Sequence, residues 1–158
     1  MKPVLKIISG GQTGVDRTAL EWAMENGVPH GGWCPKGRKA EDGAIPQGFQ
    51  LKETGSENYS IRTRRNVRDS GGTVIFSESG DLIGGTKETA EFAKEIGKPL
   101  AHLTTSIGIN EAATQLDAFL QQHGIVVLNV AGPRASEEPG VGPFVKAVLS
   151  HALKPLLR

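Results

Sequence analysis

The chain has 158 residues, a formal net charge of +1 and 37% hydrophobic residues. This length predicts a single domain, residues 1–158, with one core. A near-zero charge excludes an overall field that would attract a nucleic acid polymer or an acidic membrane, so anion binding has to come from local clusters. The single cysteine, Cys34, excludes an internal disulfide, and no apolar run reaches the roughly 20 residues of a membrane span. We therefore expect a cytoplasmic protein.

Short apolar runs alternate with segments of helical periodicity. The predicted strands span residues 4–9, 73–77, 99–103 and 125–130, with a weaker one at 30–33. The predicted helices run from a Thr13 cap to Gly27, over 58–70, from a Thr86 cap to Gly97, from a cap near Ser106 to Gly124, and from Pro143 to about Lys154. Strands that alternate with helices form parallel sheets with right-handed crossovers. The pattern predicts a Rossmann-like three-layer α/β/α sandwich with a mostly parallel sheet.

The turn after the first strand carries the strongest functional signal. It consists of Gly10, Gly11, Gln12, Thr13 and Gly14. Glycines let a backbone approach an anion closely, and the N-terminus of the following helix favours negative charge. The sequence is neither a dinucleotide fingerprint nor a P-loop, so it indicates an anion without specifying which one. The structural alternative is a tight connection in which Thr13 and a carboxylate three residues later cap the helix.

Two later turns resemble the first in composition. Gly84, Gly85 and Thr86 precede the third predicted helix, and residues 131–136, with Arg134, follow the last predicted strand. All three turns follow strands, and ligands of open parallel sheets bind beyond the carboxyl ends of the strands. We therefore expect the backbone N–H groups of residues 11–15 and 84–86 to hold phosphate oxygens in one crevice. The structural alternative for the second turn is a loop that ends in a helix cap.

Four arginines lie on the second predicted helix. At 3.6 residues per turn, Arg65 and Arg68 share a stripe with Ile61, whereas Arg62 lies on another stripe. We expect Arg65 or Arg68 to point under the crevice as a phosphate ligand, and Arg68 to neutralise the ligand's charge together with Arg134. The alternative is a basic face exposed to solvent.

The segment 34–58 interrupts the regular alternation of strands and helices. It is polar, rich in glycine and without clear periodicity, and loops of this length are usually functional or disordered. It could cover a ligand as a flap, or be a solvated loop. The four histidines lack the spacing of metal ligands, so we predict no metal site.

Several of these blocks together resemble the molybdenum-cofactor carrier family. They are SGGQTGVDRTALEWA at 9–23, GWCPKGRKAEDGAIP at 32–46, TVIFSESGDLIGGTKETAEFA at 73–93 and LNVAGPRAS at 128–136. That family is part of a Rossmann-like group that includes the LOG-type phosphoribohydrolases. The resemblance implies a phosphorylated small molecule as ligand, either molybdopterin (the molybdenum cofactor) or a nucleotide, and a homo-oligomer.

The chain departs from the LOG-type motif P-G-G-x-G-T-x-x-E at its catalytic glutamate. The corresponding residue is Thr89, and Glu88 and Glu91 lie on other sides of the helix. This difference favours a non-catalytic carrier or binding protein. Two alternatives stay open: a nucleoside monophosphate phosphoribohydrolase that uses Glu88, Glu91 or Asp16 as its carboxylate, and a nucleotide sensor whose 34–58 segment rearranges.

Overall fold

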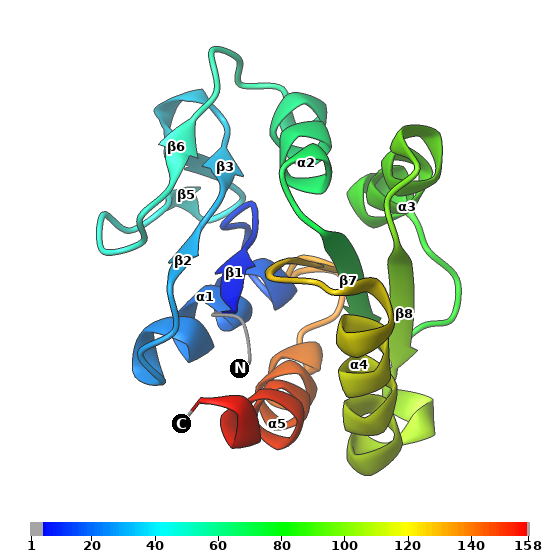
Figure 1. The fold of residues 1–158 in the computed structure, drawn as a ribbon. Coiled ribbons are helices and arrows are strands. Elements are labelled where there is room, and N and C mark those ends of the chain that lie inside the picture. The colour runs from blue at the N-terminus through cyan, green and yellow to red at the C-terminus, as the bar shows by residue number, and fades with distance from the viewer. Residues whose placement is uncertain (1–4, 158) are drawn as a thin grey trace.

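A five-stranded parallel sheet forms the centre of the molecule. The computed structural model describes residues 5–157, so Val4 of the predicted first strand lies outside the described residues. The strands are β1 (Lys6–Ile8), β2 (His30–Gly31), β7 (Gly72–Ser77), β8 (Leu100–Thr104) and β9 (Val127–Ala131). Their order across the sheet is β2-β1-β9-β7-β8, and all neighbours are parallel (Figure 1). The predicted strands are therefore confirmed, with boundaries that shift by one or two residues.

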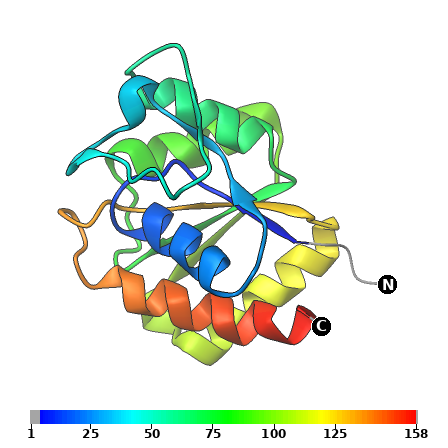
Figure 2. The same cartoon turned by 90° about the vertical axis from the view of Figure 1, so that its left-hand side faces the viewer.

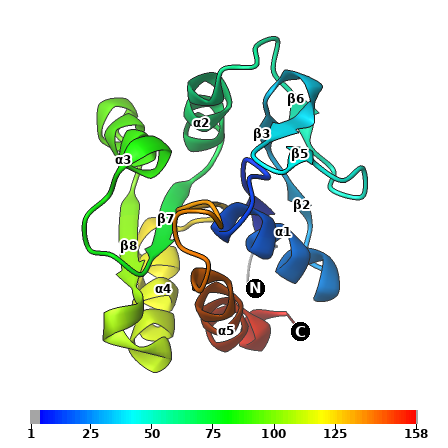
Figure 3. The same cartoon turned by 180° about the vertical axis from the view of Figure 1, so that it is seen from behind.

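Helices cover both faces of this sheet. One layer consists of α1 (Val15–Glu25), α4 (Ile109–His123) and α5 (Val141–Leu153), and the opposite layer consists of α2 (Tyr59–Arg68) and α3 (Gly84–Ile96) (Figure 2). Helices α4 and α5 pack side by side, as do α2 and α3 (Figure 3). The three-layer α/β sandwich is confirmed. Between residues 5 and 157, no helix is both long and apolar enough to cross a membrane.

The main hydrophobic core lies between the sheet and the layer of α1, α4 and α5. Strand residues that face this layer, such as Phe76, Leu128 and Val130, pack against Trp22 of α1 and Leu149 of α5. All six residues of β7 are buried, because both faces of that strand are covered. Complete burial explains why this strand is a continuous apolar run in the sequence.

The predicted N-caps are wrong at three helices. Helix α1 begins at Val15 after Gly14, α3 at Gly84 after Ile83 and α4 at Ile109 after Gly108, and none of the three has a side-chain cap. The Thr13 hydroxyl instead accepts a hydrogen bond from the backbone N–H of Ala135 at 3.1 Å, so a contact with a distant turn replaces the local cap. The glycine stops are confirmed, because Gly97 and Gly124 end their helices in the left-handed conformation.

Segment 34–58 is an ordered substructure. It contains the short pairs β3–β6 (Trp33–Cys34 with Lys52–Glu53) and β4–β5 (Lys39–Ala40 with Gly43–Ala44) and a 3₁₀ turn, Lys36–Arg38. A small cluster of its own packs against α1, formed by Leu20, Cys34, Ala40, Ile45 and Phe49. The segment without clear periodicity therefore contains local structure and a small buried cluster, although most of its residues are exposed.

The buried guanidinium of Arg38 holds this segment closed. It donates hydrogen bonds to the carbonyl oxygens of Ile45 at 3.0 Å, Pro46 at 2.6 Å and Phe49 at 2.9 Å. Hydrogen bonds from a charged donor are stronger than neutral ones. Here they provide hydrogen-bond partners for carbonyl groups within the segment. A side chain that local pattern analysis assigns to solvent is therefore the main internal support of the segment.

Replacing Arg38 should loosen this segment before the rest of the fold. Arg38→Met keeps the aliphatic stem but removes the guanidinium donor from three carbonyl groups, two of which keep a backbone hydrogen bond, so we expect the free energy of unfolding to fall by about 2–4 kcal/mol. Urea denaturation measures the loss, and limited proteolysis should cut within residues 36–50. Arg64→Met is the matched control, because the contacts of Arg64, an ion pair with Glu95 and a cation–π contact with Phe92, lie on the exposed side of its helix. Equal stability of the two variants would contradict the assigned role.

Candidate functional site

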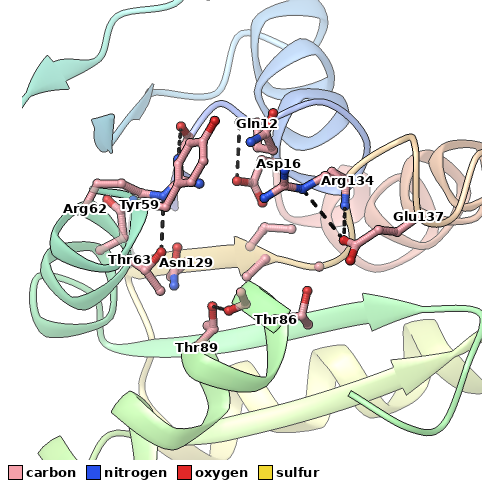
Figure 4. Close-up of a pocket in the computed structure, with 16 residues that line it drawn as sticks. Gln12, Asp16, Tyr59, Arg62, Thr63, Thr86, Thr89, Asn129, Arg134 and Glu137 are labelled. Atoms are coloured by element: carbon pink, nitrogen blue, oxygen red, sulfur yellow. Dashed lines mark hydrogen bonds and ion pairs between the residues drawn. The ribbon is translucent and has the colours of Figure 1, made fainter. Parts of the chain in front are cut away.

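A cavity of about 60 Å³ opens at the carboxyl edge of the sheet, between the first turn, α2, α3 and the turn after β9 (Figure 4). Most of the lining residues have polar side chains, and they come from four segments of the chain. The lining residues are Gly10, Gln12, Asp16, Tyr59, Arg62, Thr63, Asn66, Gly85, Thr86, Thr89, Asn129, Val130, Ala131, Gly132, Arg134 and Glu137. The predicted site residues Gly10, Gln12, Gly85, Thr86 and Arg134 are thus brought together at this cavity.

The N-terminus of α3 faces this cavity with open hydrogen-bond donors. The first intrahelical bond runs from the Lys87 N–H to the Ile83 carbonyl at 3.2 Å. Among residues 5–157, the backbone N–H groups of Gly84, Gly85 and Thr86 meet no acceptor. Gly85 and Thr86 line the cavity, so their N–H groups and the positive end of a 13-residue helix are available to an anion.

The first turn is different, because its donors are already used by the protein. Four of the five N–H groups between residues 11 and 15 are bonded internally: Gly11 to Ser9 Oγ, Gln12 to Asp16 Oδ2, Thr13 to Gln12 Oε1 and Val15 to the Pro133 carbonyl. In the described structure, the backbone of this turn therefore leaves few free donors for the phosphate oxygens that it was expected to hold. Gly11, Thr13 and Gly14 also lie outside the cavity lining.

Gly14 has a packing role instead. Its φ is +81°, and a Cβ atom there would lie 2.6 Å from the Pro133 carbonyl oxygen. Glycine therefore allows the first turn to lie against the turn after β9. Three N–H groups of the turn after β9 are also occupied, because Arg134 donates to Glu137, Ala135 to Thr13 and Ser136 to Glu41. Of the three predicted anion-binding turns, the one at α3 has the most open donors.

The predicted arginines of α2 do not reach the cavity. Arg65 lies over the indole ring of Trp33, with 4.7 Å between the guanidinium carbon and the ring centroid, and Arg68 forms an exposed ion pair with Asp69 at 2.7 Å. Ile61, which shares their stripe, is 39% exposed, so that stripe faces outward. The prediction that Arg65 or Arg68 binds the ligand is corrected by this orientation.

Arg62, in place of Arg65 or Arg68, is the arginine of α2 that lies at the cavity. It is buried, lines the cavity and donates to the Gly10 carbonyl at 2.7 Å. Burial lowers the pKa of its guanidinium, and the neighbouring Asp16 opposes that shift. The guanidinium groups of Arg62, on α2, and Arg134, in the turn after β9, lie 5.0 and 5.4 Å from the centroid of the Tyr59 ring. Two cations therefore converge on one wall of the cavity.

Asp16 provides a buried carboxyl group in the same cavity. Only 8% of the residue is exposed, and burial raises the pKa of its carboxyl to about 6, although Arg62 and the N–H group of Gln12 favour the ionised form. Desolvation is the dominant cause, since it penalises the charged carboxylate more than these partners stabilise it. Titratable groups with such shifts are concentrated at functional sites.

Two buried side-chain atoms in the cavity lack a hydrogen-bond partner. They are Nε2 of Gln12 and Oδ1 of Asn129, in residues that are 4% and 2% exposed. No acceptor or donor within the described chain reaches them. Buried polar groups are almost always paired, so this donor and this acceptor are candidate contacts for a polar ligand or a water molecule.

Local patterns missed most of the α2 contribution to this site. Tyr59, Arg62, Thr63 and Asn66 follow the i, i+3, i+4, i+7 spacing of one helix face, but the face is polar although it is buried. Hydrophobic periodicity therefore does not identify this face as buried. The polar stripe at residues 59, 62, 63 and 66 is the sequence signal that could have identified it.

No metal site is evident in the described part of the chain. Between residues 5 and 157, no group of three or more histidine, cysteine, aspartate or glutamate side chains lies close enough together to hold an ion. Glu88, one of the carboxylates considered for catalysis, accepts a hydrogen bond from the Ser60 hydroxyl at 2.7 Å, outside the cavity lining.

Comparison with known proteins agrees with this architecture. The model of the circularly permutated YpsA SLOG family matches residues 7–153. The chain belongs to this family. It also resembles a crystal structure from Syntrophus aciditrophicus SB whose protein carries the name of a molybdenum carrier, with 45% identity, a TM-score of 0.93 and coverage of 97% of this chain and 98% of that one. No curated protein matches it.

The raised pKa of Asp16 should appear in the stability of this SLOG-family protein. The folded protein binds the proton more tightly than the unfolded chain, whose carboxyl has the ordinary pKa of 3.8. The free energy of unfolding should therefore fall as the pH rises from about 4 to about 6, by about 3 kcal/mol in total from this group.

Asp16→Asn removes that contribution. Urea denaturation of both proteins at several pH values between 4 and 7 gives the difference between the two curves, which isolates Asp16 from the other carboxylates. We expect the variant to gain stability relative to the wild type as the pH rises. Two parallel curves would show that burial does not penalise the ionised carboxylate.

Proposed function

We propose that this protein binds a phosphorylated small molecule, a nucleotide or the molybdenum cofactor, at the carboxyl edge of its sheet and carries it without chemistry. The observation that carries the proposal is the open N-terminus of α3 beside a cavity with unpaired buried polar atoms. A helix N-terminus supplies N–H donors and a positive dipole end, which suit a phosphate group. The name of the 45% identical relative supports a carrier role.

In this proposal the phosphate lies against the N–H groups of Gly85 and Thr86. The guanidinium of Arg134 lies across the cavity mouth and is 3.8 Å from the Glu137 carboxylate, so it forms only a long ion pair in this structure. Its charge is therefore available to a ligand. Arg62 is more enclosed and contributes mainly to the shape and potential of the wall.

A second candidate function is cleavage at the ribose of a nucleoside monophosphate. It is favoured by Asp16, which is buried in the cavity with a pKa of about 6 and could donate a proton to a leaving base. Thr89, at the position of the LOG-type glutamate, also lines the cavity but carries no carboxyl group. Mass spectrometry of nucleoside monophosphates incubated with the protein distinguishes the two, because a carrier releases its ligand unchanged.

Ligand binding should be visible as thermal stabilisation. A ligand present at 100 times its dissociation constant stabilises a folded protein by about 2.7 kcal/mol. We would compare inorganic phosphate, purine nucleotides and molybdopterin by this measurement. If no phosphorylated compound shifts the unfolding temperature, the proposed function is wrong.

Gly85 allows a test that separates binding from folding. A Cβ atom at Gly85 would meet nothing within 4 Å, so substitution there is sterically free. Gly85→Asp places a carboxylate at the helix N-terminus, which should stabilise α3 by up to about 1 kcal/mol and weaken phosphate binding at least tenfold by repulsion. Gly85→Ala is the control and should keep the affinity. Calorimetric titration with inorganic phosphate measures both, and unchanged affinity in Gly85→Asp would place the phosphate elsewhere.

Arg134 and Arg68 form a second matched pair. Arg134→Met removes the cation at the cavity mouth and should lower the affinity for a phosphorylated ligand about tenfold, since hydrogen bonds between charged groups contribute about 1.5–3 kcal/mol. Arg68→Met removes an exposed cation of the same type that points outward, and it should leave the affinity unchanged. Similar losses in both variants would mean that overall charge, not the cavity, attracts the ligand.

A further inference from the structure

The carboxylate of Glu137 lies between the two positive groups that a phosphate at α3 would use. Its Oε1 atom is 3.8 Å from Nε of Arg134, and its Oε2 atom is 3.8 Å from the position that a Cβ atom of Gly84, the first residue of α3, would take. Glu137 lines the cavity, and its side chain points toward Arg134 (Figure 4). An anion of the protein itself therefore lies beside the N–H groups that α3 leaves open.

The contacts of this carboxylate are weak. Among residues 5–157, its hydrogen bond comes from the backbone N–H group of Arg134 at 3.4 Å, and its ion pair with the same residue is also long. The carboxylate makes no hydrogen bond to the N–H groups at the start of α3 within that range. Its side chain is 35% exposed. Rotation of the side chain toward solvent can therefore clear the site without any movement of the backbone.

The neighbouring carboxylate of Glu138 has a different, structural role. It accepts hydrogen bonds from the N–H groups of Glu78 at 2.6 Å and Ser79 at 3.2 Å, and so it anchors the loop that precedes α3. The turn that carries both glutamates is fixed by bonds from their own N–H groups to the Arg134 carbonyl oxygen, at 3.0 and 3.1 Å. A fixed backbone therefore presents Glu137 at the mouth of the cavity, and only its side chain is loosely held.

We propose that Glu137 is an internal competitor for the phosphate site at α3. In the empty protein its carboxylate balances part of the positive charge of Arg134 and of the helix N-terminus, and a phosphate group has to displace it. This inference rests on the proposed function, because it describes how the same site is regulated. When only a fraction of the molecules has an open site, the apparent affinity is reduced by that fraction.

A tethered competitor suits a protein that has to release what it binds. A phosphate group carries up to two negative charges at neutral pH and more acceptor oxygens than a carboxylate, so it can replace Glu137 at the site. As the phosphate leaves, the carboxylate returns, and Arg134 and the N–H groups of α3 regain a counter-charge. Glu137 thus lowers the affinity for the ligand and shortens the time for which it stays bound.

Calorimetric titration with inorganic phosphate tests this role. Glu137→Gln keeps the size of the side chain and an oxygen for the Arg134 N–H group, but it removes the negative charge. Two like charges about 4 Å apart repel each other enough, even at the dielectric constant of water, to change an equilibrium about fivefold. We therefore expect the variant to bind phosphate about fivefold more tightly or better. Glu91→Gln removes the same charge at an exposed position later in α3 and should leave the affinity unchanged.

Thermal stability gives a second readout of the same variant. Without phosphate, Glu137→Gln should unfold at a lower temperature than the wild type, because the helix N-terminus loses a nearby negative charge. Saturating phosphate should then raise the unfolding temperature of the variant by more than that of the wild type, since the tighter ligand stabilises more at equal concentration. Equal shifts in the two proteins would contradict the competition.

The outcomes separate this inference from the proposed function. If phosphate binds the wild type and Glu137→Gln equally well, or binds the variant more weakly, Glu137 is not a competitor, while phosphate binding stands. An equal gain in Glu137→Gln and Glu91→Gln would assign the effect to overall charge and would also overturn the inference. If phosphate binds none of the three proteins, the proposed function itself fails.

Discussion

The geometry of the candidate site depends on the side-chain carbonyl of Gln12. By accepting from the N–H groups of Thr13 and Glu41, it joins the first turn to segment 34–58. The Glu41 carboxylate then accepts from the hydroxyl groups of Thr13 and Ser136 and so connects the turn after β9 to the other two. Three parts of the chain that are far apart in sequence are fixed together, and the donor end of the same amide is left facing the cavity.

The architecture could be predicted because burial dictates it. Strand β7 is an apolar run since both of its faces are covered, and α4 shows apolar periodicity since one of its faces packs on the core. The helix starts could not be predicted in the same way. Thr13 has the composition of a cap, yet its hydroxyl bonds to Ala135 and Glu41, and no local rule contains those distant partners.

The site could be predicted in part, for a similar reason. The turns at Gly10 and Gly84 look alike in sequence, but in the first one the side chains of Gln12 and Asp16 fold back onto the backbone N–H groups, whereas α3 begins after an apolar residue that offers no acceptor. Arg62 was missed because amphipathic reasoning assigns arginine to solvent. Its helix buries a polar face, which only the assembled neighbours of that helix explain.

The two layers of the molecule differ in what fills the space against the sheet. Below it, aromatic and aliphatic side chains form a continuous core, but at the carboxyl edge above it the corresponding positions hold Asn129, Arg62, Asn66 and the cavity. The proposed small-molecule ligand would occupy the space that side chains leave open in that layer. Because the ligand would contact both α2 and α3, its binding would stabilise the packing of these two helices on the sheet. Local unfolding of α2 and α3 would then be coupled to release of the ligand.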